Sequence, residues 1–237
     1  MSNCETKRRV LITGCSRGIG LALAEHFLAA DSLVIGCSRS LPPIDSDHFC
    51  HFALDLNDAD AVTAMMRTVR KEHGGLDVLI NNAGVASMAP VALQPPQIAR
   101  NVVELNLNSM VSITHSAIRL LRSGTNPRIV NFSTVAVPYR LEGEAIYSAT
   151  KAAIEQWSRV LAKELGPMGI TVNVVGPTPV RTDLIRGIAE EKLEALIARQ
   201  AIPRWGTVED VINVIDFFVD PRSDFVTGQV LYLGGAG

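Results

Sequence analysis

The sequence predicts an α/β fold in which one doubly wound parallel sheet of about seven strands carries helices on both faces. Short runs of Val, Ile and Leu alternate with longer segments of helical periodicity along all 237 residues. Hydrophobic residues make up 47% of the chain and aromatic residues only 5%, which suits the aliphatic core of buried parallel strands. No repeat or linker divides the chain. We therefore expect residues 1–237 to form a single domain.

The expected elements follow one another in the order of βαβ units with right-handed crossovers. Strands are expected at 8–13, 32–37, 50–54, 77–82, 128–133, 170–175 and 229–233, and helices at 18–30, 58–73, 97–122, 145–165, 184–199 and 207–219. The Pro-containing stretches SMAPVALQPP and VGPTPVRTD follow strands, so they should lie at the carboxyl edge of the sheet, where open α/β sheets bind ligands. The 184–206 stretch interrupts the strand rhythm and is expected to be a mobile substrate lid.

Composition argues against several classes of partner. The 22 Lys and Arg residues nearly balance the 24 Asp and Glu residues, so neither nucleic acid nor a membrane surface is expected to bind. No apolar run approaches the ~20 residues needed to cross a bilayer, and the first strand begins too early to leave room for a signal peptide. The four cysteines, which are Cys4, Cys15, Cys37 and Cys50, lack metal-binding spacing. We expect reduced thiols, no metal and a cytoplasmic protein.

A glycine-rich segment, TGCSRGIG, joins the first strand to the first helix. Its glycines, Gly14, Gly18 and Gly20, have the spacing G-x-x-x-G-x-G. Such glycines permit a tight turn and close approach of a ligand to the backbone, and the N-terminus of the following helix attracts a pyrophosphate. The alternative is an ordinary turn between strand and helix. The position after the first strand favours nucleotide binding.

The end of the second strand predicts which nicotinamide cofactor binds. Sites that prefer NAD place an acidic residue there to hold the ribose hydroxyls, but this chain has Ser38 and Arg39. Arg39 can pair with the 2′-phosphate of NADP(H), and Arg17 in the glycine segment can flank the phosphate from the other side. The alternative is two solvated surface arginines. The missing carboxylate favours NADP(H).

Tyr147 and Lys151 form a pair on the helix expected over 145–165. Their spacing of four residues places the phenol and the ammonium on one face, about one turn apart. A neighbouring cation stabilises the phenolate and lowers the tyrosine pKa toward the range useful for proton transfer. Taken alone, the pair is more simply interpreted as two surface residues of an amphipathic helix, and only the rest of the sequence can favour a catalytic role.

The motifs together resemble those of the compact, single-domain short-chain dehydrogenases/reductases, which have a Rossmann-type fold, and in particular 3-oxoacyl-[acyl-carrier-protein] reductases and related carbonyl reductases. The matching segments, in order, are TGCSRGIG, LDL at 54–56, NNAG at 81–84, VELNLNS, NFST, YSATK, GPTPVRTD, RWGTVEDV and VTGQVLYLGG. The resemblance implies an NADPH-dependent oxidoreductase that reduces a carbonyl to an alcohol. Two alternatives stay open: an NAD-linked alcohol dehydrogenase of the same fold, and a nucleotide-binding regulator without catalysis.

The resemblance also implies roles for individual residues. Tyr147 would be the general acid, Lys151 would lower its pKa and bind the nicotinamide ribose, and Asn106 would hold a water that links Lys151 to solvent. The residues implied in cofactor binding are Gly14, Ser16, Arg17, Gly18, Ile19, Gly20, Arg39, Asp55, Leu56, Asn82, Ala83, Gly84, Tyr147, Lys151, Pro177, Val180 and Thr182. Within this set, Asp55 and Leu56 match the family's adenine contacts. Asn106 and Thr182 have structural alternatives, as caps of a turn and of a helix.

The sequence departs from the family pattern at two positions. The family's catalytic serine lies thirteen positions before the tyrosine, and here that position is Thr134, while Ser133 precedes it. Because neighbouring strand residues point to opposite faces, the two hydroxyls should not be interchangeable, and we assign the role to Thr134. Thr178 stands where family members commonly have glycine. It would either crowd the nicotinamide face or reshape the substrate mouth.

The substrate pocket is expected between the 135–146 loop, the SMAPV segment and the lid. Tyr139, Arg140, Glu142 and Glu144 are polar candidates at its mouth, or else solvated loop residues. The implied substrate is a small ketone or a 3-oxoacyl thioester of acyl carrier protein or CoA. Docking of acyl carrier protein is weakened because Thr125 and Met168 stand where relatives tend to be basic, although Arg119, Arg122 and Arg128 lie close by. A homodimer or homotetramer is expected through helices 97–122 and 145–165.

Overall fold

The computed structural model describes residues 7–236 and contains one sheet of seven parallel strands in the order β3-β2-β1-β4-β5-β6-β7. The strands are β1 (Arg9–Thr13), β2 (Leu33–Ser38), β3 (Phe49–Ala53), β4 (Val78–Asn81), β5 (Arg128–Phe132), β6 (Thr171–Gly176) and β7 (Val230–Tyr232). Each of the seven strands begins within one residue of the position expected from the sequence. This agreement, together with the parallel sheet, confirms the predicted fold class. Cys4 lies outside the described residues.

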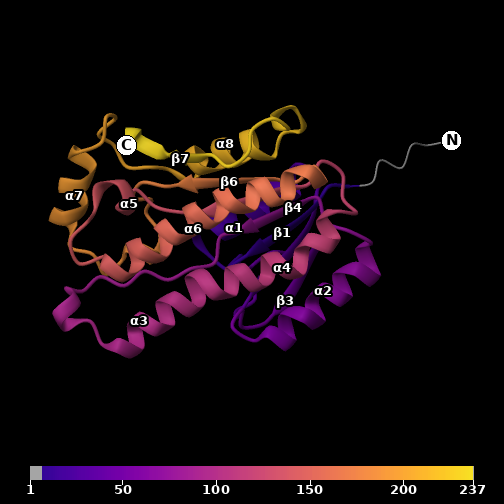
Figure 1. Cartoon of the computed structure of the whole chain (residues 1–237), viewed down its shortest axis with the longest axis horizontal. Coiled ribbons are helices and arrows are strands. Elements are labelled where there is room, and N and C mark those ends of the chain that lie inside the picture. The colour runs from indigo at the N-terminus through magenta and orange to yellow at the C-terminus, as the bar shows by residue number, and fades with distance from the viewer. Residues whose placement is uncertain (1–6, 237) are drawn as a thin grey trace.

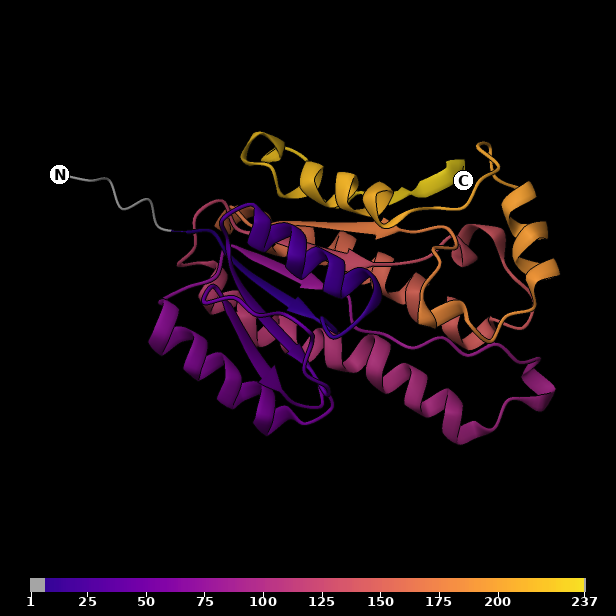
Figure 2. The same cartoon turned by 180° about the vertical axis from the view of Figure 1, so that it is seen from behind.

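Helices cover both faces of the sheet (Figures 1 and 2). The helices are α1 (Gly18–Ala29), α2 (Ala59–His73), α3 (Pro96–Val103), α4 (Ser109–Leu121), α5 (Ala136–Tyr139), α6 (Ala145–Leu165), α7 (Glu190–Ala198) and α8 (Val208–Val219). Successive residues of a strand point to opposite faces, so Leu11 packs in one core with α2, α4 and α6, and Val10 and Ile12 pack in the other with α1 and α8.

Three helical regions differ from the expectation. The helix expected over 97–122 is divided into α3 and α4 by a π-helical turn at Glu104–Asn108, where one extra residue enters the turn. The helix expected over 184–199 is shorter: α7 begins at Glu190, after a 3₁₀ turn at Asp183–Ile185. The loop after β5 contains the short helix α5, which ends where Arg140 adopts a left-handed conformation with φ of 52°.

The sheet order places the candidate site. The chain moves outward from β1 to β2 and β3, then returns to β4 on the other side of β1. At such a reversal the loops after adjacent strands diverge and leave a crevice at the carboxyl ends. The glycine segment follows β1, and the NNAG segment includes and follows the end of β4, so both meet at this crevice. Within residues 7–236, no helix is both long and apolar enough to span a membrane.

Candidate functional site

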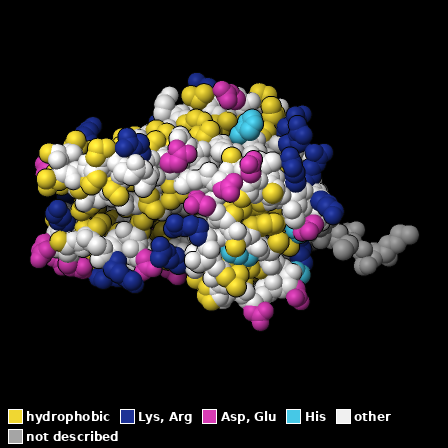
Figure 3. All heavy atoms as spheres, turned by 90° about the horizontal axis from the view of Figure 1, so that it is seen from below, with side chains coloured by type: hydrophobic (Ala, Val, Ile, Leu, Met, Phe, Trp, Pro, Cys, Tyr) yellow, Lys and Arg dark blue, Asp and Glu magenta, His cyan; other side chains and the backbone are white. Residues whose placement is uncertain are grey.

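A cavity of about 560 Å³ lies at the carboxyl ends of the strands. Its wall is formed by the segments after β4, β5 and β6, by the N-terminal half of α6 and by the 184–199 region with α7. Most of the lining side chains are apolar, among them Met88, Val135, Ile188 and Leu196. Figure 3 shows hydrophobic side chains in a recess whose rims carry charged groups, at the end of the molecule away from the N-terminus. Residues of the 184–199 region line the cavity, and the role of the 184–206 segment as a mobile lid stays a prediction.

The glycine segment leaves no room for side chains on the side that faces β4. Gly14 has a φ of +70°, and a Cβ there would lie 2.9 Å from the Cα of Ala83. A Cβ on Gly20 would lie 2.2 Å from the carbonyl oxygen of Gly14. Asn82 holds the turn by donating hydrogen bonds from Nδ2 to the carbonyls of Thr13 (3.0 Å) and Gly14 (3.1 Å). The segment is therefore a fixed backbone cradle.

The first turn of α1 is open to an anion. The N-cap residue Arg17 makes no side-chain hydrogen bond to the helix, so the first amide groups are not capped by it. These groups and the helix dipole favour a negatively charged ligand. The residues present therefore fit the pyrophosphate of a dinucleotide.

The structure separates the two arginines proposed for the 2′-phosphate. Arg39 is exposed directly after β2 and has no ion pair among the described residues. Arg17 is also exposed, but its Nη1 lies 3.4 Å from a carboxylate oxygen of Asp183, at the start of the lid. Ser38 is buried and tied to the sheet edge, since its Oγ lies 2.8 Å from His51 Nε2. Arg39 is thus the available cation at the end of β2.

The other predicted cofactor residues divide into two groups. Eight of them line the cavity: Ile19, Asn82, Gly84, Tyr147, Lys151, Pro177, Val180 and Thr182. Asp55 and Leu56 lie outside it, after β3. Asp55 accepts a hydrogen bond from the Asn57 amide at 3.0 Å, and Leu56 is buried in the core beneath α2. Thr182 occupies the N-cap of the 183–185 turn but makes no side-chain capping bond.

Tyr147 and Lys151 both face the cavity from α6 and are buried. The Lys151 Nζ donates a hydrogen bond to the carbonyl of Phe132 at 3.0 Å and lies 5.9 Å from the centre of the Tyr147 ring. Burial lowers the pKa of Lys151 to about 8.

The expected lowering of the Tyr147 pKa is wrong for this structure. Burial raises the pKa of the phenol, the nearby Glu144 carboxylate raises it further, and the hydrogen bond with Thr134 opposes both effects. Loss of solvation is the largest of these effects on the Tyr147 pKa. Tyr147 is consequently a protonated phenol at neutral pH, which is the form that can donate a proton.

Asn106 lies in the π-helical turn and is 1% exposed. Its Oδ1 accepts a hydrogen bond from the Val85 amide (2.8 Å), and its Nδ2 donates one to the Val85 carbonyl (2.9 Å). A Cβ on Gly84 would lie 3.2 Å from this Oδ1 and 3.5 Å from Lys151 Nζ. Asn106 therefore fixes the segment after β4 close to Lys151. Its role in a water relay stays a prediction.

Ser133 and Thr134 have different partners. The buried Ser133 donates a hydrogen bond to Glu155 Oε1 at 2.5 Å, and Tyr232 donates to the same oxygen at 2.5 Å. Thr134 instead lines the cavity with Tyr147 and acts to lower the pKa of the phenol, and its Oγ1 accepts a hydrogen bond from the Ala136 amide at 3.2 Å. The hydroxyl beside the tyrosine is therefore that of Thr134.

Thr178 points toward the end of the lid. Its buried Oγ1 donates a hydrogen bond to Oε1 of Gln200, which is also buried. Gln200 in turn donates from Nε2 to the carbonyl of Arg204 at 3.0 Å. Thr178 was expected either to crowd the nicotinamide face or to reshape the substrate mouth. These hydrogen bonds favour the second effect, because they connect Thr178 to the 184–206 segment. Gln200 was not predicted from the sequence, because nothing in its local pattern marks it.

The polar residues of the 135–146 loop also divide into two kinds. Arg140 and Glu142 are exposed and also line the cavity, so they lie at its mouth. Tyr139 is held at the rim, where its hydroxyl donates to the Arg199 carbonyl at 3.1 Å and the Arg199 guanidinium lies 4.6 Å above its ring. Glu144 is only 8% exposed and lines the cavity.

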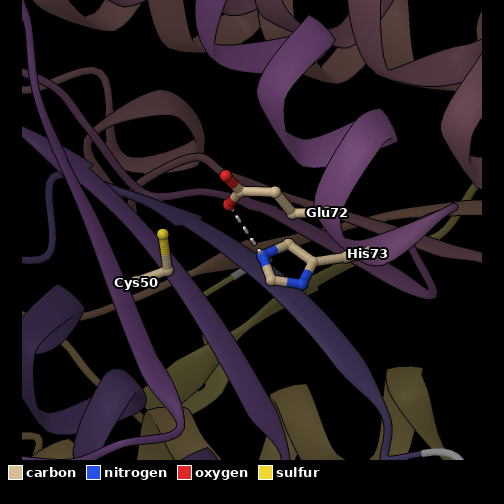
Figure 4. Close-up of side chains that lie close together, drawn as sticks. All are labelled: Cys50, Glu72 and His73. Carbon is tan, nitrogen blue, oxygen red and sulfur yellow. Dashed lines mark ion pairs between the residues drawn. The ribbon is translucent and has the colours of Figure 1, made fainter.

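A second group of chemically active side chains lies far from the cavity, near the start of β3 (Figure 4). Cys50, Glu72 and His73 have their ligand atoms within 4.8 Å of one another, and Glu72 Oε2 lies 4.0 Å from His73 Nε2. Ligand atoms of a tetrahedral zinc site lie closer, at about 3.5 Å, as follows from metal–ligand distances near 2.0–2.3 Å. The three side chains are therefore too far apart for a tetrahedral zinc site, and they consist of a long Glu72–His73 contact with the Cys50 thiol beside it.

Comparisons with known proteins agree with this architecture. The family described as "Enoyl-(Acyl carrier protein) reductase" matches residues 14–235. The 3-oxoacyl-[acyl-carrier-protein] reductase FabG of Escherichia coli is 29% identical over 231 residues, 95% of each chain, and that of Vibrio cholerae is 28% identical over 231 residues.

Two solved structures are similar over nearly the whole chain. The ligand-free aldohexose dehydrogenase of Thermoplasma acidophilum has a TM-score of 0.87 and 27% identity, covering 97% of this chain and 93% of that one. A short chain dehydrogenase of Leptospira borgpetersenii with bound NAD+ has a TM-score of 0.88 and 25% identity, covering 98% and 92%.

Proposed function

The chain belongs to the short-chain dehydrogenase/reductase family, and from this premise we propose that it reduces a ketone or a 3-oxoacyl thioester to an alcohol with NADPH. The observation that carries the proposal is the meeting of Thr134, Tyr147 and Lys151 in one cavity beside the glycine cradle. A neutral phenol, a second hydroxyl and a buried ammonium are together suited to protonating a carbonyl oxygen.

When bound, NADPH supplies the hydride that reduces the carbonyl carbon. The Thr134 hydroxyl donates a hydrogen bond to the carbonyl oxygen and polarises it, and Tyr147 transfers its phenolic proton to that oxygen as negative charge develops. Lys151 stabilises the resulting phenolate, and Asn106 holds the 84–85 backbone against it. The apolar walls exclude water and strengthen these interactions.

Tyr147→Phe tests catalysis against mere nucleotide binding. The substitution removes the proton donor but preserves the ring that fills the cavity wall. We expect turnover of a ketone panel, followed by NADPH absorbance, to fall below detection while NADPH affinity, followed by fluorescence, changes less than about threefold. Unchanged turnover in this variant would exclude the proposed mechanism. Tight NADPH binding without turnover in the wild type would favour a regulator.

The preference for NADPH over NADH is supported by the unpaired, exposed Arg39 and by the absence of an acid directly after β2. NAD-linked catalysis is the second candidate, because the similar Leptospira dehydrogenase was solved with NAD+. We expect kcat/KM to be higher with NADPH, and Arg39→Asp to reverse the preference by removing the phosphate partner. Arg67→Asp, at an exposed position on α2, is the control. A wild-type preference for NADH would contradict the assignment.

A role with acyl thioesters is supported by the names of the bacterial relatives and by the apolar side chains that make up most of the cavity lining. Docking of a carrier protein would use Arg119 and Arg122, which are exposed. Arg128 is 1% exposed and cannot take part. A homodimer or homotetramer through α4 and α6 stays part of the proposal, and a cytoplasmic location is likewise expected.

A further inference from the structure

Glu144 is a buried carboxyl group that the proposed mechanism does not use. It precedes α6, is 8% exposed and lines the cavity. Its side chain makes no hydrogen bond or ion pair within residues 7–236, and it does not cap the helix that follows it. Burial raises the pKa of Glu144, and no neighbouring cation compensates the loss of solvation. The carboxyl oxygens of Glu144 are not among the fully buried, unsatisfied polar atoms of the described residues, so they are accessible from the cavity to a ligand that donates a hydrogen bond.

We propose that Glu144 is a specificity-determining residue that accepts a hydrogen bond from a substrate hydroxyl next to the reacting carbonyl, so that the enzyme prefers neutral hydroxylated carbonyl compounds. This inference rests on the proposed function, because it assumes that the carbonyl oxygen lies at Tyr147.

The position of Glu144 relative to Tyr147 determines how far the substrate hydroxyl can lie from the reacting carbonyl. Residues three apart at the start of a helix share a face, with Cβ atoms about 5–6 Å apart. Glu144 is the N-cap residue of α6, and both it and Tyr147 line the same cavity. A hydroxyl on the carbon adjacent to the carbonyl can therefore reach Glu144 while the carbonyl oxygen meets the phenol.

The chemistry of the carboxyl selects the class of substrate. Both its neutral and its ionised form accept a hydrogen bond, whereas a methyl group in place of the hydroxyl leaves the carboxyl unpaired. A carboxylate next to the carbonyl, as in a 2-oxo acid, would be repelled by ionised Glu144. The apolar part of the wall, with Met88, Val135, Ile188 and Leu196, suits an apolar body, and the charged side chains of Arg140, Lys192 and Arg199 also line the cavity. The similar Thermoplasma structure is named for action on an aldohexose, which is a polyhydroxylated carbonyl compound.

Pairs of ketones that differ only by hydroxyl against methyl test the inference. Suitable pairs are 2-hydroxycyclohexanone with 2-methylcyclohexanone, and 3-hydroxy-2-butanone with 3-methyl-2-butanone. The enzymes compared are the wild type, Glu144→Leu, Glu144→Gln and, as a matched control, Glu164→Gln at an exposed position near the far end of α6. The readout is kcat/KM for each ketone with NADPH and with NADH.

We expect the wild type and Glu164→Gln to prefer the hydroxylated member of each pair by about tenfold, the effect of one hydrogen bond to a charged or buried acceptor. Glu144→Leu should reduce this ratio to about one, because kcat/KM falls for the hydroxylated ketones alone. Glu144→Gln should retain part of the preference. A purely structural role would lower the rates on both members together. Equal rates in the wild type, or a ratio unchanged in Glu144→Leu, would overturn the inference and leave the proposed function standing. Failure to reduce any ketone of a broad panel, 3-oxoacyl thioesters included, would overturn both.

Discussion

Removal of the Thr134 hydroxyl should reduce turnover far more than removal of the Ser133 hydroxyl. Thr134 lines the cavity together with Tyr147, where a carbonyl oxygen would take up negative charge. One donor to such an oxyanion contributes about 3–4 kcal/mol, or 10²–10³ in kcat. We therefore expect Thr134→Val, which preserves the branched shape, to lose about two to three orders of magnitude in kcat.

Ser133→Ala should change stability instead. The substitution removes one of the two hydroxyls that bond Glu155 Oε1 and leaves a buried carboxylate less well satisfied. Such a loss costs about 1–3 kcal/mol. The melting temperature should fall, while kcat changes by less than about threefold.

The assay is steady-state oxidation of NADPH with a fixed ketone, combined with thermal unfolding of each variant. Thr134→Ser is the matched control, because it retains the hydroxyl and loses only the methyl group, and it should keep most of the activity. A fully active Thr134→Val beside an inactive Ser133→Ala would refute the assignment.

Two further predictions use the charged groups. Because burial lowers the pKa of Lys151 to about 8, reductive kcat/KM should fall as the pH rises through about 8, where the ammonium loses its proton. A pH–rate profile measures this, and a profile flat to pH 10 would contradict it. Although burial opposes them, hydrogen bonds from Arg9 and Thr125 hold the pKa of Asp77 below its usual range. Ionised Asp77 therefore stabilises the fold above its unfolded pKa of about 3.9, and this contribution is lost as the pH falls through the lower folded value. Asp77→Asn should cost about 3 kcal/mol in urea unfolding at pH 7 and much less near pH 2.

The strands were predictable because each is a short aliphatic run between polar or glycine-containing segments. Their parallel arrangement followed from right-handed crossovers, whereas the order of the strands and the reversal after β3 come from the structure. The opposite partners of Ser133 and Thr134 were predictable for the same reason, since adjacent residues at a strand end point to opposite sides. In these cases the local pattern alone carries the information.

The π-helical turn at Asn106 was not predictable. The helical periodicity of 97–122 continues through the turn, and no proline or glycine marks the extra residue. The turn is held from outside the helix, by the two hydrogen bonds between the Asn106 amide and the Val85 backbone. Tertiary contacts of this kind leave no periodic signal in the sequence.

The direction of the Tyr147 pKa was mispredicted for a related reason. The spacing of Tyr147 and Lys151 shows that a cation is near, but not that the cavity wall and Glu144 desolvate and repel the phenolate.

The spacing of four continues to Glu155, one turn beyond Lys151 on the same face of α6. There the carboxylate binds Ser133 after β5 and Tyr232 at the end of β7. One helix face therefore carries the proton donor, the ammonium and the group that joins α6 to two strand ends. Because these strand ends belong to the rigid sheet, Glu155 helps to fix the position from which Tyr147 meets its substrate.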